Sequence, residues 1–282
     1  RKIWVLNVGD IKPSEYLTEF FLDMAWDINL SGCKGGSGIV FSHLGNWLNQ
    51  TFGKKTGKEL LPLMKDFYLL SHIRKPEFMG NTRTYDKRHE QIADLPWSTE
   101  EINERLERFK KLSDRVEKLY ATVPSNRKEA YFEMIQYPVQ ASNEMNKKML
   151  YAQFARHTPS DSASLWKKSD AAYDSIVSLT RRFNSLLDGK WNSIMSVGPR
   201  GLIVFDKVKH TASSSDLKEY PAPLQSWNGT EYTSASGSYT VIDGLGYAGK
   251  AIYLAKGGTV KYEFKNNRKD SLTVEVHLVP TH

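Results

Sequence analysis

The first apolar residues of the chain follow the order of a strand, a loop and a helix. Residues 3–8 form a short, almost uninterrupted apolar run, Gly9 breaks it, and residues 16–26 repeat apolar positions with helical spacing. An uninterrupted apolar run is typical of a parallel strand that helices cover. Ser14 follows a proline that disfavours an earlier helical start, so it is the expected N-cap. The pattern predicts a strand over 3–8 and a helix over 16–26.

A glycine-rich segment, residues 32–38, separates this helix from a second predicted helix at residues 39–52. The segment lacks the Gly-Lys-Ser/Thr ending of a phosphate-binding loop, and a dinucleotide site would need a strand immediately before it. We therefore expect a flexible connector at 32–38. Together these elements predict that the first ~50 residues are the last strand-helix units of an α/β domain.

Long amphipathic helices are predicted between residues 58 and 187. The segment 98–101, Ser-Thr-Glu-Glu, has the sequence of a capping box and should begin a helix. Pro138 lacks a backbone donor, so the helical pattern around it should kink or break near Gln136. The last helix should stop at Gly189, a residue that readily takes the left-handed conformation of a C′ position.

Beyond Trp191 the composition changes to glycine, serine, threonine and proline, with short runs typical of strands. Turn signals recur about every 8–12 residues, a spacing typical of β-sandwiches. The runs are too few for two complete sheets. Strands are predicted at residues 202–205, 239–242, 251–254, 260–264 and 272–279.

Charge and cysteine content argue against several classes of function. The 282 residues carry 39 Lys and Arg against 32 Asp and Glu, a net charge of +7, but most basic residues stand beside acids, as at 104–108. Without a basic stripe we expect no nucleic-acid partner. No apolar run reaches the roughly 18–20 residues of a membrane span. Cys33 is the single cysteine and no Cys/His set has zinc-ligand spacing, so we expect no disulfide, metal or cofactor.

Candidate chemistry begins at Asn7, which stands at the carboxyl end of the predicted parallel strand. α/β folds and barrels place binding groups at that edge. An amide can donate to and accept from sugar hydroxyls, and Gly9 lets the backbone approach a ligand. The alternative is an Asn-x-Gly turn in which the side chain satisfies only its own backbone. Trp191 and the later aromatic residues likewise leave two interpretations open, a sugar-stacking platform or an ordinary core.

Three longer motifs resemble glycoside hydrolase family 115, the xylan α-1,2-glucuronidases. They are WVLNVGDIKP at 4–13, EFFLDMAW at 19–26, and YFEMIQYPV at 131–139 followed by 141–146. The resemblance implies a multidomain α and β fold. Its parts are the C-terminal end of a catalytic (β/α)8 barrel at 1–55, an α-helical bundle at 56–190, and a linker with the start of a C-terminal β-sandwich at 191–282.

The resemblance also implies an activity, the removal of glucuronic acid or its 4-O-methyl ether from xylan with inversion. Inversion requires two carboxyl groups about 6.5–9.5 Å apart. In the family these carboxylates lie in earlier barrel strands, upstream of this chain, so no catalytic residue is nominated here. Asn7 matches the family's barrel-end asparagine that contacts the sugar and is the one substrate-binding residue carried over. Asp10 and Lys12 receive no role.

The partners implied are xylan or glucuronoxylan oligosaccharides, and the parent enzyme is expected to be a homodimer in the periplasm, secreted or at the cell surface of a bacterium. The chain itself is expected to be an inactive piece of that enzyme. The expectation that part of the barrel is missing also rests on the large apolar side chains near the start of the chain. Only a whole barrel would supply the rest of the core for Trp4, Leu6, Phe20, Phe21, Trp26 and Trp47.

A second hypothesis is a non-catalytic module. Residues 56–190 and the β segment carry amphipathic surfaces and aromatic residues but no acid/base pair. Such a module would bind polysaccharide or join subunits.

Overall fold

The structure is a computed structural model. It describes one part of the chain together with its side chains, and it describes four short strands by their backbone alone. The described residues are 5–9, 11–27, 30, 36–75, 79, 94–95, 97, 99–211, 230–234, 240–243, 250–253 and 262–266. They belong to two compact units, one of residues 1–68, 107–145 and 172–197, and one of residues 69–106, 146–171 and 198–282. We call these unit 1 and unit 2. The division at residues 55 and 190 stays a prediction.

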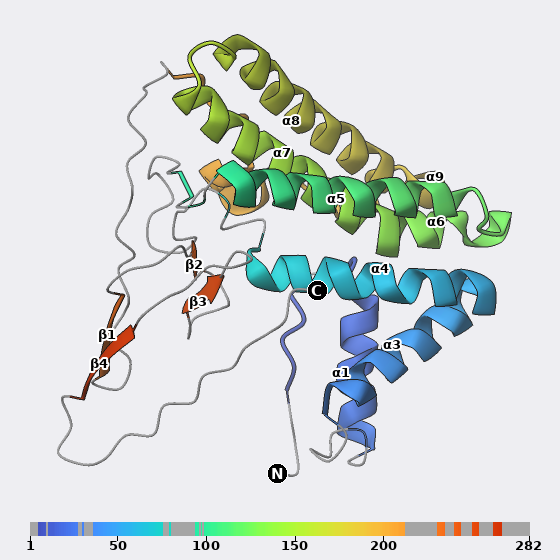
Figure 1. The fold of residues 1–282 in the computed structure, drawn as a ribbon. Coiled ribbons are helices and arrows are strands. Elements are labelled where there is room, and N and C mark those ends of the chain that lie inside the picture. Colours follow the sequence, from blue (N-terminus) through green and yellow to red (C-terminus); the bar gives the residue numbers. More distant parts are fainter. Residues whose placement is uncertain are drawn as a thin grey trace. The chain divides into compact units, whose positions relative to one another are not determined.

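Helices dominate the described residues, as Figure 1 shows. The α-helices are α1 (Glu15–Trp26), α3 (Gly36–Phe52), α4 (Lys54–Ile73), α5 (Thr99–Tyr120), α6 (Lys128–Tyr131), α7 (Tyr137–His157), α8 (Ser162–Asn184) and α9 (Leu186–Gly189). Short 3-10 turns are η2 (Ser125–Arg127), η4 (Pro199–Gly201) and η5 (Ile203–Phe205). The predicted helices at 16–26 and 39–52 and the long helices after residue 58 are confirmed.

The glycine-rich connector is shorter than predicted, because residues 36–38 form the first turn of α3. The first four N–H groups of any helix have no intrahelical partner. The helix therefore loses few hydrogen bonds when its first turn contains glycine. Residues 32–35 lie outside the described part of the chain. At its other end α3 stops at Gly53, whose φ of +89° is a conformation that L side chains rarely adopt.

Aromatic side chains form one part of the core of unit 1, where α1, α3 and α6 meet. The ring centroids of Tyr16 and Trp47 are 5.1 Å apart, and Phe52 meets Trp47 at 6.2 Å and Tyr131 at 5.5 Å, both edge to face. Such pairs stabilise by about 0.5–1.5 kcal/mol each beyond the burial of their area. They attach the N-terminal helices to the helical bundle.

An apolar surface nevertheless remains on α1. Trp26 is 92% exposed, Leu17 54% and Leu22 55%. Of the large side chains expected to need a bigger core, Trp47 is already buried in unit 1. Trp4 lies outside the described residues.

The α-helical pattern is interrupted near Gln136, where a kink or break was predicted, but the interruption is a π-helical segment, η3 (Phe132–Gln136), through which the helix continues. Pro138 has no N–H to donate to the carbonyl of Met134, which an α-helix would require. The helix widens by one residue per turn over η3 instead and continues as α7. Glu133 therefore occupies a turn whose geometry differs from that of the flanking helix.

α7 and α8 run antiparallel (Figure 1). In unit 1 the hydroxyl of Tyr137 lies 3.2 Å from Oγ1 of Thr180, and in unit 2 Oγ of Ser169 donates to the carbonyl of Lys148 at 2.7 Å. Phe183 packs beside Tyr137 with ring centroids 4.8 Å apart.

The end of α8 differs from its prediction, because the helix stops at Asn184 rather than at Gly189. Leu187 and Asp188 have positive φ values of 52° and 55°, and Gly189 has a φ of 82°. The backbone N–H of Leu187 donates to Oε1 of Glu129 at 3.1 Å, outside the helical ladder. Glu129 thus accepts a hydrogen bond from a backbone N–H just beyond the point where the helical ladder ends.

A buried arginine holds unit 2 together. Nε of Arg105 donates to Oδ1 of Asn146 at 2.6 Å, and its two terminal nitrogens donate to the carbonyls of Leu70, at 3.2 Å, and Arg74, at 2.9 Å. Those carbonyls lie at the C-terminal end of α4, where backbone C=O groups have no N–H partner within the helix. The positive charge of Arg105 also faces the negative end of the helix dipole there.

A buried lysine on α7 fixes the segment that follows η4. Lys148 is fully buried and its Nζ donates to the carbonyls of Val204, at 2.7 Å, and Asp206, at 2.8 Å. Burial lowers the pKa of Lys148 to about 7. A neutral amine still has two N–H donors for these two carbonyls.

Residues 203–205 form η5 and not the predicted strand. The N–H of Phe205 bonds the carbonyl of Leu202, and that of Asp206 bonds the carbonyl of Ile203. A four-residue apolar run fits either structure by its periodicity. Here the side chain of Val204 is buried and its carbonyl accepts a hydrogen bond from Lys148. These two contacts favour the 3-10 turn over a strand.

Four strands lie further on, paired two by two. β1 (Thr230–Ser234) is antiparallel to β4 (Tyr262–Asn266), and β2 (Thr240–Asp243) is antiparallel to β3 (Lys250–Tyr253). The strands predicted at 239–242 and 251–254 are confirmed, and the one at 260–264 lies two residues later. β1 was missed, and 272–279 lies outside the described residues. The β-sandwich stays a prediction.

The predicted N-terminal strand is not seen over residues 5–8, which are in neither a helix nor a strand. A strand requires the ladder hydrogen bonds of a neighbour. The described strands pair only with one another. Residues 3–4 lie outside the described part, and the barrel stays a prediction.

Candidate functional site

Asn7 lies in an exposed turn ahead of α1. Its side-chain oxygen accepts a hydrogen bond from the backbone N–H of Gly9 at 3.0 Å, and Gly9 has a φ of +66°. This is the Asn-x-Gly turn of the alternative interpretation, and it leaves the side chain at the surface. A contact between Asn7 and a sugar stays a prediction. Asp10 lies outside the described residues.

Five residues after Asn7, Lys12 is bound between two carboxylates. Its Nζ donates to Oε1 of Glu15, at the start of α1, and to Oε1 of Glu133, in η3. The ring of Trp191 lies against the same ammonium, with 4.3 Å from Nζ to the ring centroid. The side chains of Lys12 and Glu133 are only 12% and 8% exposed. We call these four residues the Lys12 cluster.

The pKa values of the two carboxyl groups in the Lys12 cluster are shifted in opposite directions. Burial lowers the pKa of Lys12, but hydrogen bonds and charges from Glu133 and Glu15 outweigh it, so the pKa is raised. Burial would raise the pKa of Glu15, yet hydrogen bonding with Glu133 and Lys12 lowers it on balance. Burial, and then hydrogen bonding with Glu15, raise the pKa of Glu133 to about 7 against the opposing pull of Lys12. Glu15 is the ionised partner and Glu133 the readily protonated one.

The two carboxyl groups are not placed for inverting hydrolysis. Both bind one ammonium nitrogen, so they are closer together than the roughly 6.5–9.5 Å that an attacking water needs. The cluster is also largely covered by protein. Its chemistry suits a fixed attachment of the residues before α1 to the bundle.

Replacing Glu133 by glutamine is expected to flatten the dependence of stability on pH. The folded pKa of about 7 lies above the ordinary 4.5, so the stabilisation from protonated Glu133 is complete below pH 4.5 and is lost as pH rises through 7. Relative to Glu133→Gln, the wild type should lose roughly 1 kcal/mol of unfolding free energy between pH 5 and pH 8. Urea denaturation at both pH values measures this. Glu104→Gln, on the exposed face of α5, is the control, and parallel profiles for wild type and Glu133→Gln would contradict the expectation.

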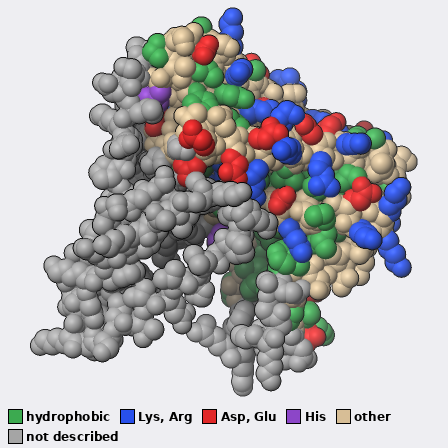
Figure 2. Space-filling view, in the orientation of Figure 1, with side chains coloured by type: hydrophobic (Ala, Val, Ile, Leu, Met, Phe, Trp, Pro, Cys, Tyr) green, Lys and Arg blue, Asp and Glu red, His purple; other side chains and the backbone are tan. Residues whose placement is uncertain are grey.

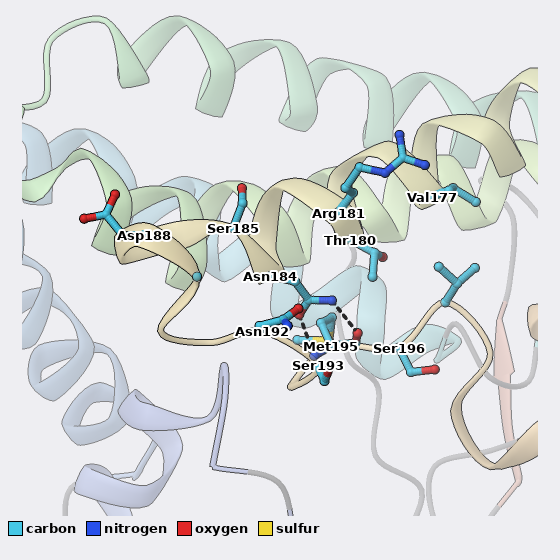
Figure 3. Close-up of a pocket in the computed structure, with 12 residues that line it drawn as sticks. Val177, Thr180, Arg181, Asn184, Ser185, Asp188, Asn192, Ser193, Met195 and Ser196 are labelled. Carbon is cyan, nitrogen blue, oxygen red and sulfur yellow. Dashed lines mark hydrogen bonds between the residues drawn. The ribbon is translucent and has the colours of Figure 1, made fainter.

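A shallow groove of about 870 Å³ follows the C-terminal half of α8 and the loop after it (Figure 3). Asn184 is one of the lining residues, and its side chain donates to the carbonyl of Met195 at 2.9 Å and accepts from the N–H of Met195 at 3.0 Å. Oγ of Ser185 donates to the carbonyl of Arg182 at 2.8 Å. These polar groups already serve the fold, so we assign the groove no ligand.

The surface shows mixed charge and no metal cluster in the part of the chain that is described. Blue and red side chains are interspersed on the face in Figure 2. α5 carries two ion pairs of exposed side chains, Lys110–Asp114 and Lys111–Glu107. No three His, Cys, Asp or Glu side chains of the described residues gather to hold a metal ion. None of the described helices is long and apolar enough to span a bilayer.

Sequence reasoning missed the role of Lys12 and Glu133, although both lie in motifs that carried the family resemblance. The spacing of Lys12 and Glu15 is a signal for a local ion pair. Glu133 is 121 residues from Lys12, and nothing in one sequence joins residues so far apart. Trp191 proves to pack against the core cluster of Phe132, Tyr137, Phe183 and Leu186, so the core interpretation holds for this residue.

Comparison with known proteins supports the family resemblance. Residues 1–78 match the model of glycosyl hydrolase family 115. Eleven chains of solved structures match, among them one described as a novel family GH115 4-O-methyl-α-glucuronidase, BtGH115A, with specificity for decorated arabinogalactans. That chain is 46% identical with a TM-score of 0.70, over 89% of the present chain and 32% of its own length. No curated protein matches.

The present chain thus spans about a third of the solved enzyme. The motif at 4–13 lies within the family match, and the helical part of the fold is shared with the solved enzyme. On these two matches, the chain belongs to glycoside hydrolase family 115.

Proposed function

We propose that this chain is part of an α-glucuronidase that removes glucuronic acid or 4-O-methyl-glucuronic acid from a branched plant polysaccharide. The observation that carries the proposal is the 46% identity, over 89% of the chain, to an enzyme described as a 4-O-methyl-α-glucuronidase. Xylan is the substrate implied by the sequence motifs, whereas the solved enzyme is described as acting on decorated arabinogalactans.

Release of the uronic acid from both polymers decides between these substrates. The full-length enzyme is incubated with glucuronoxylan and with a glucuronidated arabinogalactan, and the free sugar acid is quantified. We expect faster release from glucuronoxylan. Early NMR spectra test the stereochemistry, since an inverting enzyme acting on an α-linkage releases the β-anomer first. An α-anomer at early times, or release from arabinogalactan alone, would contradict the corresponding part.

We further propose that Asn7 contacts the uronic acid. Replacing Asn7 by alanine should lower kcat/KM of the full-length enzyme by about 5–150-fold, the effect of losing a hydrogen bond of about 1–3 kcal/mol. Because alanine also removes the acceptor for the N–H of Gly9, a second variant is needed.

Asn7→Asp keeps that acceptor but replaces the amide donor by a negative charge, which would repel a uronate. If Asn7 contacts the sugar acid, aspartate should be at least as defective as alanine. If Asn7 serves only its turn, aspartate should restore activity, and the contact is rejected. Asn103→Ala, on the exposed face of α5, is the matched control and should match the wild type.

The full-length enzyme is also proposed to be a homodimer that acts in the periplasm or outside the cell, on family grounds. Light scattering coupled to gel filtration measures the mass, and a monomeric mass at micromolar concentration would rule out a stable dimer.

A further inference from the structure

We infer that Lys12 is a positioning residue for substrate binding: by joining the N-terminal loop to Glu133 of the helical bundle, it determines where the Asn7 turn stands. The inference rests on the proposed function, since it assigns Lys12 a role through Asn7. It concerns unit 1 alone, to which all of these residues belong.

The first argument is that three segments far apart in sequence converge on one ammonium group. Glu15 comes from α1, Glu133 from η3, and Trp191 from the segment after α9. Lys12 itself is in a turn outside any helix. A side chain that leaves a loop and is nearly covered by protein, with both carboxylates bonded to it, fixes that loop to the bundle.

The second argument is the short reach between this attachment and Asn7. Five residues span at most about 16–18 Å when extended. The chain is also fixed on the far side of Lys12, because the N–H of Ser14 bonds the carbonyl of Ile11 at 3.0 Å and the N–H of Thr18 bonds that of Ser14 at 2.9 Å. On the near side, Asn7 closes its own turn onto Gly9. A movement of Lys12 is therefore transmitted to Asn7, because few backbone torsions between the two residues are left to absorb it.

The third argument concerns why a charged group is used here. A covered ion pair costs desolvation and is weak evidence of stability, but removing one partner leaves the others unpaired and displaces what they hold. Glu133 lies in η3, whose widened turn follows from the proline at 138. The helix interruption thus presents the carboxylate to the loop.

The experiment is a double-mutant cycle in the full-length enzyme. Lys12→Met keeps the length of the side chain and removes its donors, and should lower kcat/KM about tenfold or more. In the Asn7→Ala background the same substitution should cost less than about twofold, because a residue that acts through Asn7 has nothing left to position. Hydrogen exchange of residues 5–13 should accelerate in Lys12→Met. Lys110→Met, which breaks only an exposed ion pair with Asp114, should change neither readout.

The outcomes separate this inference from the proposed function. If Asn7→Ala leaves kcat/KM unchanged, the role of Asn7 fails and the positioning role with it. If Asn7→Ala is impaired but Lys12→Met is normal, or the two losses multiply in the double variant, only the inference is overturned. Should Lys12→Met fail to fold, Glu133→Met breaks the same attachment from the bundle side, and the same non-additivity with Asn7→Ala is expected.

Discussion

Replacing Arg105 by alanine is expected to lower the free energy of unfolding of the 282-residue chain by about 3–5 kcal/mol, because three buried hydrogen bonds are lost and a cavity is left. The substitution removes the hydrogen bonds that Arg105 donates to the carbonyls of Leu70 and Arg74 and to the side-chain oxygen of Asn146. It also removes the positive charge at the end of α4 and opens space in the core of unit 2. Urea denaturation followed by circular dichroism measures the loss.

Two variants make this result specific. Arg105→Lys keeps the charge but cannot reach three acceptors with one compact ammonium, so its loss should be intermediate. Arg115→Ala removes an exposed arginine from the same helix and should be near neutral. An alanine variant as stable as the wild type would show that solvent satisfies these acceptors.

The second large effect is expected at Lys148. Lys148→Met has nearly the same volume, so the main loss is the two hydrogen bonds to the carbonyls of Val204 and Asp206. Each buried acceptor left unpaired costs about 1–3 kcal/mol. Part of the loss is offset because burying the amine was itself unfavourable, so we expect a net loss of about 2 kcal/mol. Amides of residues 203–208 should exchange faster, and Lys167→Ala, exposed on α8, should leave them unchanged.

Lys148 also implies a pH dependence of opposite sign to that of Glu133. Its folded pKa, about 7, lies below the ordinary 10.5, so between these values the unfolded chain binds a proton that the folded chain does not. Stability from this group therefore rises with pH from about 7 to 10.5. In Lys148→Met this rise should disappear, and an unchanged slope would mean that Lys148 does not titrate there.

The helices could be predicted because their signals are local. α1 and α5 follow from apolar spacing, and the interruption at Gln136 follows from one proline whose missing donor acts within its own turn. The prediction failed at 203–205, where a buried lysine 56 residues away is the partner of Val204. It failed also at the end of α8, where Leu187 and Asp188 take positive φ values and the N–H of Leu187 bonds Glu129, 58 residues away.

The candidate site divides in the same way. Asn7 was identified from its place after an apolar run, and the turn it forms with Gly9 is local chemistry that its sequence predicts. The Lys12 cluster depends on a carboxylate 121 residues away and on a tryptophan beyond α9, so only folding brings them together. Burial strengthens the interaction between Lys12 and Glu133, because little water screens the charges. The order of residues along the chain does not predict this burial.

The π-helical segment before Pro138 has a consequence for insertions and deletions. Each α-helical residue advances the helix by about 100°, so deleting one residue between 134 and 136 rotates Glu133 and everything upstream of it by about that angle relative to α7. Such a deletion turns Glu133 away from Lys12, while Pro138 still lacks the N–H that a regular α-helix requires. Homologous enzymes that lack the extra residue should therefore also lack the lysine or carry a different partner for it, so the length of this turn serves as a marker of whether the loop is attached.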